Sequence, residues 1–280
     1  MSENNIIWVT GANGFLGSEL SQRFADYGYS VVGTDAELSV AETERMEAFA
    51  QEIHPLAIVN CAGIRRDATG LSNRIKAYEV NALGARNVAL VANSCGAMMV
   101  QVSSDDVYSG KLTEPVNEFD NPHPDTPYGK SKRAGEAMVR DTMSEHIIAR
   151  SSWIYHAQSG RMFDALEAAR KGEKVAARMD QFAAPCSVKS YAAFLCHAIE
   201  KRAYGTFHIC PTGKASRYEF SAKVLEYAGY DPSSVLIPTT DARTAENIVL
   251  ESLMLEMLGA DLPTWEEDLR SYMEEQGLLK

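Results

Sequence analysis

Short apolar runs rich in β-branched residues alternate with longer segments of helical periodicity along the first half of the chain. Runs of this length that are apolar throughout are typical of buried strands. The predicted strands cover residues 6–10, 29–34, 56–60, 97–104 and 146–152, and the predicted helices cover about 14–27, 41–53, 72–94 and 127–144. Strands that alternate with helices predict right-handed crossovers and a doubly wound α/β fold, with a parallel sheet covered on both faces.

The alternation becomes less regular after about residue 152. Capping boxes mark two helix starts, at Ser216 and at Thr264. No internal repeat, low-complexity segment or linker separates the two halves, so we expect one compact body with a C-terminal lobe. The predicted helices of this second half cover residues 160–171, 188–201, 216–228 and 264–276, and the strand candidates cover 205–210 and 234–237.

Composition narrows the class of protein. The 280 residues are 45% apolar and 23% charged, with a formal net charge of −11. An acidic chain repels polyanions, so nucleic acid is not expected as a partner. The chain has no apolar run long enough to span a bilayer and no signal peptide, so we expect no membrane association and a cytoplasmic protein. The five cysteines are scattered and form no CxxC pair, which favours reduced thiols over a zinc site.

A glycine-rich turn, "VTGANGFLGSEL", follows the first strand and opens the first helix. Its glycines allow a tight turn, close approach of a pyrophosphate to the backbone, and close packing of helix on strand. The helix N-terminus offers N–H groups and a partial positive charge to phosphates. We therefore predict a dinucleotide site. The residues of this turn expected to bind the cofactor are Gly11, Asn13, Gly14, Phe15, Leu16 and Gly17.

Asp35 ends the second strand, 18 residues after Gly17. An acid at this place accepts hydrogen bonds from the adenosine ribose and repels a 2′-phosphate, which favours NAD(H) over NADP(H). NADP(H) stays open as a cofactor, and a plain capping role for Asp35 is the alternative.

The end of the third strand, "IVNCAGI", places small residues where the adenosine half of the cofactor would lie. Cys61, Ala62 and Gly63 are the expected contacts. Asn81 is polar within an otherwise apolar helix face. It either steadies a neighbouring strand or a bound water, or is a satisfied core amide.

Ser103 and Ser104 end the fourth predicted strand, at the edge where doubly wound folds bind ligands. Thr126 and Pro127 are typical of a helix start. Tyr128 and Lys132 are four residues apart and therefore share one helix face, which we expect to point toward Ser104. Lys130 lies on another side of that helix and is expected to be a solvated surface charge.

These three polar side chains predict proton-coupled hydride transfer. A phenol has an ordinary pKa of about 10, and the nearby Lys132 ammonium and an oxidised nicotinamide would lower it. Ser104 can hold a substrate oxygen while Tyr128 exchanges a proton with it, and Lys132 can also bind the nicotinamide ribose. The predicted catalytic residues are Ser104, Tyr128 and Lys132, and the predicted cofactor contacts here are Ser103, Tyr128 and Lys132.

Together these motifs resemble the extended short-chain dehydrogenase/reductases, and more closely the dTDP-4-dehydrorhamnose reductase family. That family carries "STDYVFDG" where this chain has "SSDDVYSG", and the likeness continues through "TPYGKSKRAGE", "IIARSSWIY" and "LPTWEEDL". It spans nearly the whole chain. The resemblance implies an NAD(P)-binding Rossmann-type domain over residues 1–155. It also implies a smaller, mainly substrate-binding α/β lobe over residues 156–280, some of whose segments return to the first domain.

The resemblance also implies an activity: reduction of the 4-keto group of a dTDP-linked 6-deoxy sugar, giving dTDP-L-rhamnose. Ser104 takes the place of the family's catalytic threonine and keeps its hydroxyl. Trp153 corresponds to the tryptophan that lies against the sugar, although a core aromatic is the alternative. The residues expected to bind the substrate are Ser104, Asp105, Trp153 and Arg243.

Three departures from the family pattern concern the substrate side. Ala184 and Cys186 replace the usual Gly and Thr, and "RTAENIVL" replaces the family's "RP.NS.L" element, in which Arg243 is still able to contact a phosphate. The loop "GIRRDATG" brings Arg65 and Arg66 to the expected crevice.

Two other functions stay open. One is a sugar-nucleotide epimerase or dehydratase of the same superfamily. The other is a non-catalytic subunit, because the family includes a regulatory subunit of methionine adenosyltransferase. A homodimer is usual for the superfamily and is considered for this chain, and no set of ligands in the sequence demands a metal.

Overall fold

The computed structural model describes residues 5–64, 71–260 and 263–280, and the chain forms two compact units. The first unit contains the chain up to Tyr108 together with Asn121–Arg150 and Ala192–Phe207. The second unit contains Ser109–Asp120, Ser151–Tyr191 and His208–Lys280. Each unit is therefore assembled from segments that are distant in sequence.

The first unit contains a six-stranded sheet with the strand order β10-β5-β4-β3-β1-β2. Strands β1 to β5 pair in parallel, and β1 lies between β2 and β3. Ligands of doubly wound folds bind where the strand order reverses, which here is the C-terminal end of β1 and β3. The strands are β1 Ile6–Thr10, β2 Ser30–Thr34, β3 Ala57–Asn60, β4 Met98–Val102, β5 His146–Arg150 and β10 Gly205–His208.

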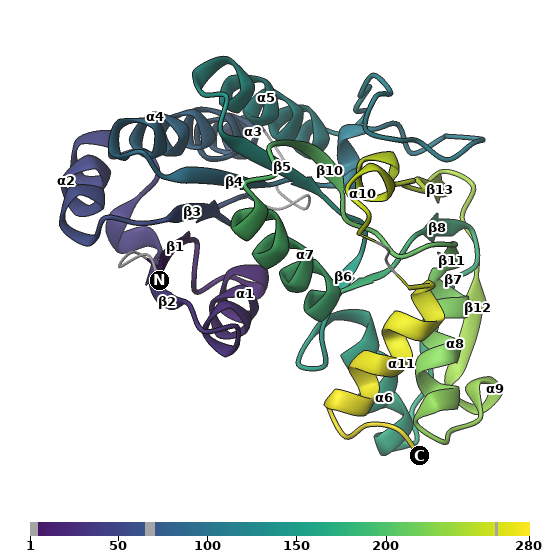
Figure 1. Ribbon diagram of the computed structural model, residues 1–280. Coiled ribbons are helices and arrows are strands. Elements are labelled where there is room, and N and C mark those ends of the chain that lie inside the picture. The colour runs from purple at the N-terminus through teal and green to yellow at the C-terminus, as the bar shows by residue number, and fades with distance from the viewer. Residues whose placement is uncertain (1–4, 65–70, 261–262) are drawn as a thin grey trace. The chain divides into compact units, whose positions relative to one another are not determined.

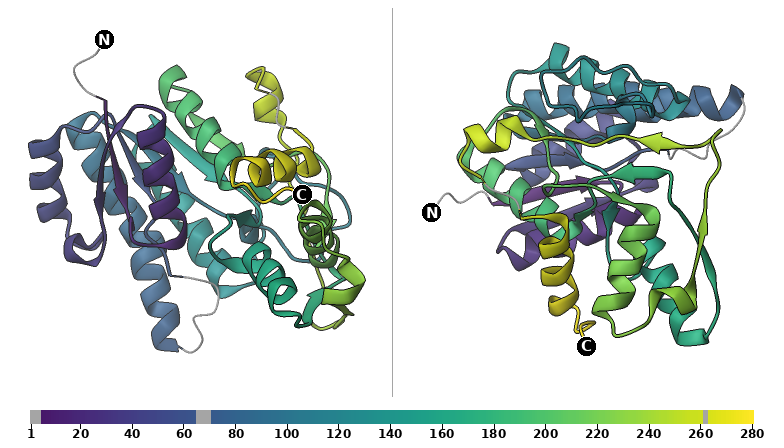
Figure 2. Two further views of the ribbon diagram at one scale, coloured as in Figure 1. Left: turned by 90° about the horizontal axis from the view of Figure 1, so that it is seen from below. Right: turned by 90° about the vertical axis from the view of Figure 1, so that its right-hand side faces the viewer.

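Helices cover both faces of this sheet. Figure 1 shows α2, α4 and α5 on one face and α1 and α7 on the other, and the left view of Figure 2 shows the first strands between α2 and α1. This arrangement confirms the predicted Rossmann-type doubly wound fold. The helices are α1 Phe15–Asp26, α2 Thr43–Ile53, α3 Leu71–Tyr78, α4 Ala85–Cys95, α5 Pro127–Thr142 and α7 Val188–Lys201.

The helix predicted over residues 72–94 is interrupted. A π-helical segment, η2 (Glu79–Gly84), separates α3 from α4. Single π turns inside helices are frequent at functional sites. Helix α5 packs closely on this segment, because a Cβ added to Gly135 would lie 2.1 Å from the Asn81 carbonyl oxygen. Apolar periodicity carries no signal for one extra residue per turn, so the sequence predicted one continuous helix.

The second unit contains small sheets and five helices among the described residues. The helices predicted at 160–171, 216–228 and 264–276 are confirmed, as are both capping boxes, at Ser216 and Thr264. The helices are α6 Gly160–Lys171, α8 Arg217–Tyr227, α9 Pro232–Val235, α10 Leu253–Met257 and α11 Trp265–Glu275. The strands are β6 Ile154–Tyr155, β7 Val175–Arg178, β8 Gln181–Ala183, β9 Cys186–Ser187, β11 Ala215–Ser216, β12 Leu236–Thr239 and β13 Glu246–Asn247.

One buried carboxylate organises the middle of the second unit. Asp268 accepts hydrogen bonds from the Tyr155 hydroxyl at 2.9 Å and from the backbone and hydroxyl of Ser187 at 2.7 and 2.6 Å. These bonds hold α11 against β6 and β9. Figure 2 shows α11 beside α8 and α8 beside α6, so the three helices form one layer. Among the described residues, no helix combines the length and apolar character needed to cross a membrane.

Candidate active site

The glycine turn lies at the C-terminal end of β1 and packs directly against the end of β3. Gly11 has φ +68°, and a Cβ added to it would lie 2.7 Å from the Ala62 nitrogen. A Cβ on Gly17 would lie 2.2 Å from the Gly11 oxygen. Gly14 is the N-cap of α1 and supplies no side-chain cap, so the first turn of the helix is open to an anion. The cradle therefore fits a dinucleotide pyrophosphate.

Asp35 lies beside this turn, as expected for an acid that binds the adenosine ribose. Its carboxylate accepts hydrogen bonds from the Asn13 N–H at 3.0 Å and the Ala36 N–H at 2.8 Å. Asp35 thus caps the short helix η1 (Ala36–Leu38), and the same carboxylate borders the cofactor cradle. The Asp35 N–H donates to Glu37 Oε1 at 2.7 Å, which adds a second carboxylate to this edge. Phe15 and Leu16 are the first residues of α1, and both are half-buried.

The end of β3 continues the cradle. Cys61 and Ala62 are half-buried and Gly63 is exposed. Asn81 is buried, and its side chain accepts from the Ile64 N–H at 2.8 Å and donates to the Ile64 carbonyl at 3.1 Å. Asn81 therefore fixes the segment that follows β3, and its amide also donates to the Ser131 hydroxyl at 2.9 Å, so it fits the description of a satisfied core amide as well. The adjacent Arg65 and Arg66 lie outside the described residues.

A ladder of buried polar side chains crosses three strands behind the cradle. The Thr10 hydroxyl donates to Asn60 Oδ1 at 2.7 Å, and Asn60 Nδ2 donates to Gln101 Oε1 at 2.8 Å. Gln101 Nε2 then donates to the Val102 carbonyl at 2.8 Å. Lys132 Nζ donates to the same carbonyl at 2.6 Å. The ladder therefore connects the end of β1 with the predicted catalytic lysine.

Lys132 is buried in the first unit, and its environment changes its proton affinity. Burial lowers the pKa of its ammonium to about 8, although the charge of Glu136 opposes the change. Burial also raises the pKa of the Cys61 thiol to about 12, and the Lys132 charge opposes that change. Cys61 therefore lies near the ammonium as a neutral thiol. An ammonium with a lowered pKa can stabilise a neighbouring phenolate near neutral pH.

Ser104 stands at the start of a short helical turn, η3 (Asp105–Val107), directly after β4. Its hydroxyl donates to Asp105 Oδ1 at 2.9 Å and accepts from the Asp106 N–H at 3.2 Å. The hydroxyl of Ser103, in contrast, donates to the buried carboxylate of Glu136 at 2.7 Å. The Ser103 side chain therefore serves the interior of the unit, and its N–H donates to the Ala149 carbonyl at 2.8 Å, so the predicted contact with the cofactor would have to come from its carbonyl oxygen.

Tyr128 lies in the first turn of α5, where the sequence placed it. The Thr126 hydroxyl caps this helix by accepting from the Gly129 N–H at 2.9 Å. Gly129 lets α5 approach η3 closely, because a Cβ there would lie 1.9 Å from the Asp106 oxygen. This contact brings the helix start that carries Tyr128 next to the turn that follows Ser104. Lys130 is exposed, as expected.

A buried ion pair, which sequence reasoning missed, supports this arrangement. Glu136 and Arg150 are both buried and form two hydrogen bonds, at 2.8 and 2.7 Å. Arg150 also donates to the Tyr108 hydroxyl at 2.7 Å, and Glu136 accepts from Ser103. Burial would raise the pKa of Glu136, but Arg150 and Ser103 outweigh it and keep that pKa lowered. Glu136 lies four residues after Lys132 in α5, so the pair joins α5 to the ends of β4 and β5.

The predicted substrate residues of the second unit differ in their surroundings. Trp153 is half-buried, has φ +38°, and is stacked by the Arg217 guanidinium, whose carbon lies 3.4 Å from the ring centroid. The side chain of Arg243 is 89% exposed and pairs with Asp241 at 3.1 Å. Ala184 and Cys186, two of the departures from the family pattern, are fully buried within the unit.

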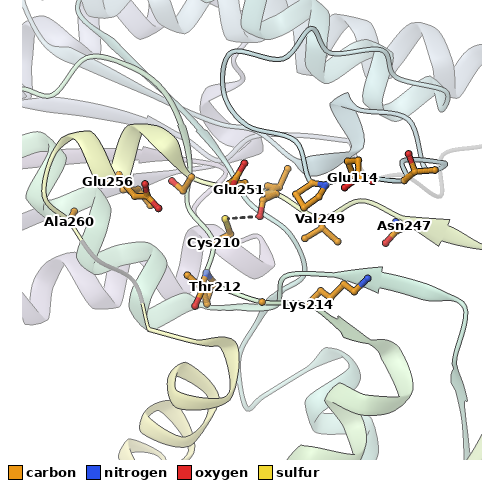
Figure 3. A pocket seen from close by; sticks show the side chains of 16 residues that line it. Glu114, Cys210, Thr212, Lys214, Asn247, Val249, Glu251, Glu256 and Ala260 are labelled. Atoms are coloured by element: carbon orange, nitrogen blue, oxygen red, sulfur yellow. Dashed lines mark hydrogen bonds between the residues drawn. The ribbon is translucent and has the colours of Figure 1, made fainter.

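A cavity of about 360 Å³ also lies in the second unit, and none of the predicted substrate residues lines it. Figure 3 shows its wall, with Cys210 and Val249 near the middle of the view and Glu114, Glu251 and Glu256 around them. The Cys210 thiol donates to the Leu250 carbonyl at 3.5 Å. Three exposed carboxylates and the exposed Lys214 line it, and its walls are otherwise largely apolar.

Comparison with known proteins identifies the family. The sequence model described as "RmlD substrate binding domain" matches residues 5–277. The chain belongs to the RmlD family. It is 31% identical over 277 residues to the spore coat polysaccharide biosynthesis protein SpsK of Bacillus subtilis, covering 96% of this chain and 97% of SpsK. It is 30% identical to the dTDP-4-dehydrorhamnose reductase of Burkholderia thailandensis, covering 92% and 95% of the two chains.

Solved structures give the same result. The crystal structure of dTDP-4-dehydrorhamnose reductase from Bacillus anthracis in complex with NADP superposes with a TM-score of 0.89 at 30% identity. The match covers 97% of this chain and 99% of that one. Membership of the RmlD family confirms the resemblance seen in the sequence and the expected enzyme class, an NAD(P)-dependent oxidoreductase. The chain is accordingly a member of the sugar-nucleotide reductases.

Proposed function

We propose that this RmlD-family protein reduces the 4-keto group of a nucleotide-linked 6-deoxy sugar, with dTDP-4-dehydrorhamnose as substrate and dTDP-L-rhamnose as product. One observation carries the proposal. The buried Lys132 ammonium binds the Val102 carbonyl, two residues before Ser104 and one helical turn from Tyr128. This arrangement supports proton transfer at the strand end that borders the cofactor cradle.

The proposed proton chemistry uses residues of the first unit. The Ser104 hydroxyl is proposed to orient the carbonyl oxygen of the substrate, and the Tyr128 phenol to donate its proton to that oxygen. The charge of Lys132 stabilises the phenolate that results. A bound nicotinamide supplies the hydride. Asn81 and the Val102 carbonyl hold the surrounding backbone and the ammonium in place throughout.

The cofactor preference is proposed from Asp35. Its carboxylate borders the glycine turn, and Glu37 adds a second negative charge at the same edge. These charges would repel the 2′-phosphate that distinguishes NADP(H), so we propose that NADH is used at least as well as NADPH. The complex of the Bacillus anthracis reductase with NADP makes NADPH the necessary comparison.

The substrate is proposed from the relatives' names and from the likeness along the chain. A dTDP-4-dehydrorhamnose reductase and a spore coat polysaccharide biosynthesis protein match at about equal identity. Both names are consistent with a sugar nucleotide. The buried changes at Ala184 and Cys186 leave the exposed side chains of the second unit to decide which sugar is accepted.

The test is oxidation of NADH or NADPH by the purified protein on addition of dTDP-4-dehydrorhamnose. We expect Tyr128→Phe to lower kcat by at least about a hundredfold, because it removes the proton donor and leaves the ring. Lys130→Met is the matched control on the same helix, and it should keep wild-type rates because Lys130 is exposed. Cofactor binding without oxidation, unchanged in Tyr128→Phe, would favour a binding subunit over an enzyme.

A further inference from the structure

Two unfavourable local arrangements meet at one contact in the second unit. Trp153 adopts φ +38°, a left-handed backbone that costs a non-glycine residue roughly 1–3 kcal/mol. Arg217 is the first residue of α8, where the helix dipole favours acids over cations. Residues that oppose local preferences in this way are concentrated at functional sites.

The two side chains form one stacked pair. The guanidinium carbon of Arg217 lies 3.4 Å from the centre of the Trp153 ring, well within the range of a cation–π contact. The backbone on both sides of Trp153 is fixed, because the Ser151 hydroxyl donates to the Ile209 carbonyl at 2.6 Å and Tyr155 binds Asp268. The N–H bonds of a stacked guanidinium lie in the guanidinium plane, parallel to the aromatic ring, and point outward from the stack. There they can form the paired hydrogen bonds that phosphates accept.

Arg243, the arginine singled out by the sequence, is less suited to bind an anion. Its side chain is 89% exposed and its guanidinium is occupied by the Asp241 carboxylate, at 3.1 and 3.3 Å. Solvent weakens the contribution of so exposed a cation to binding. Arg217 is half-buried and held flat on an aromatic ring, so less side-chain entropy is lost when it binds.

We propose that Arg217 is the residue with which the second unit recognises the diphosphate of its nucleotide substrate, and that Trp153 holds the guanidinium in the orientation this requires. The proposal rests on the proposed function and adds to it the group that is recognised. It also assigns to Arg217 the phosphate contact that the sequence assigned to Arg243.

The experiment compares two variants that each remove one arginine charge from the second unit, Arg217→Met and Arg243→Met. Isothermal titration measures the binding of dTDP, and of thymidine as a ligand without phosphate. Steady-state kinetics with the sugar nucleotide give KM and kcat. Methionine keeps an apolar stem against Trp153, and thermal unfolding verifies that each variant is folded.

We expect Arg217→Met to weaken dTDP binding and raise KM by about tenfold or more, which is the loss expected for one charge-assisted hydrogen bond. Thymidine binding and kcat should change by less than about threefold, and Arg243→Met should resemble the wild type. Arg217→Lys should be intermediate, because it keeps the charge and loses the planar fork.

The outcomes separate this inference from the proposed function. If the wild type binds dTDP and Arg217→Met binds it equally well, or if Arg243→Met shows the loss instead, the assignment of Arg217 is wrong. Equal loss of thymidine and dTDP binding would make the stack a support for the shape of the site, and would also overturn the proposal. If the wild type does not bind dTDP, the proposed function itself fails.

Discussion

Lys132 carries a charge in a buried position. The buried charge lowers the stability of the folded protein and supports the proposed activity. The lowering of its pKa from 10.5 to about 8 corresponds to roughly 3 kcal/mol of unfavourable free energy when the ammonium is charged. The hydrogen bond to Val102 returns part of that cost. The charged Lys132 therefore makes the folded protein less stable at neutral pH, a cost that fits its proposed role in proton transfer.

The stability of the protein should accordingly depend on pH through this lysine. Between about pH 8 and 10.5 the unfolded chain holds a proton at Lys132 that the folded chain has released, so this group's contribution to stability rises with pH. We expect Lys132→Met to stabilise the protein at pH 7 by about 1–2 kcal/mol and to remove this rise, while reduction is lost. Thermal unfolding from pH 7 to 10 measures both effects. Lys130→Met should leave the curve unchanged, and a variant at Lys132 that is less stable at pH 7 would contradict the argument.

At the scale of elements, α5 holds the site together. Its first turn carries Tyr128, its second carries Lys132, and its third carries Glu136, which binds Arg150 at the end of β5. The helix is thereby fixed to the end of β5 by a buried ion pair, and to the end of β4 by the hydrogen bond that Ser103 donates to Glu136. Any tilt of α5 would have to break this pair.

Removing one member of the pair should be more damaging than removing both. We expect Glu136→Gln to lower the free energy of unfolding by about 3–5 kcal/mol, because Arg150 is left charged in the interior. The double variant with Arg150→Met should recover part of that loss. Because the folded pKa of Glu136 is lowered, its contribution is present above pH 5 and is lost as acid protonates it. Denaturation at pH 7 and pH 4 tests both statements, and additive losses would refute the coupling.

The sequence predicted α5 well and its anchoring poorly, for a physical reason. Thr126 and Pro127 are local signals, because they determine the start of α5 through contacts with residues only a few positions away. Glu136, Arg150 and Tyr108 come together only after the strands have paired, and no local pattern reports such a contact. The π-helical turn around Asn81 was missed for a related reason, since tertiary packing by Gly135 favours it.

At the scale of the whole molecule, the predicted cofactor residues all lie in the first unit, whereas Trp153 and Arg243 lie in the second. Cofactor binding should therefore stabilise the first unit directly. The expected domain boundary at residue 155 stays a prediction, as does a homodimer. The two units do not correspond to the two halves of the sequence, because Ala192–Phe207 belongs to the first unit.

Cofactor binding offers a test at this scale. NADH or NADPH at a hundred times its Kd should add about 2.7 kcal/mol of stability, and hydrogen exchange should slow first in strands β1 to β4. The ratio of the Kd values for NADH and NADPH measures the effect of Asp35 on cofactor preference. Asp35→Ala should shift this preference toward NADPH. Gly11→Ala should abolish both the added stability and the slower exchange, because its Cβ would lie within 3 Å of Ala62. Exchange that slows only in the second unit would place the cofactor elsewhere.

The ladder from Thr10 to Val102 also bears on how the sheet forms. Strands as apolar as β1, β3 and β4 offer little to distinguish one alignment from another shifted by a residue. Thr10 is paired with Asn60 and Asn60 with Gln101, and all three are buried. A shift in register would leave these buried polar groups without hydrogen-bond partners, which would destabilise the sheet by about 1–3 kcal/mol for each group. The hydrogen bonds of this ladder, which ends at the Val102 carbonyl bound by Lys132, therefore also select the register of β1, β3 and β4 during folding. The register that satisfies these buried groups is also the one that assembles the candidate active site.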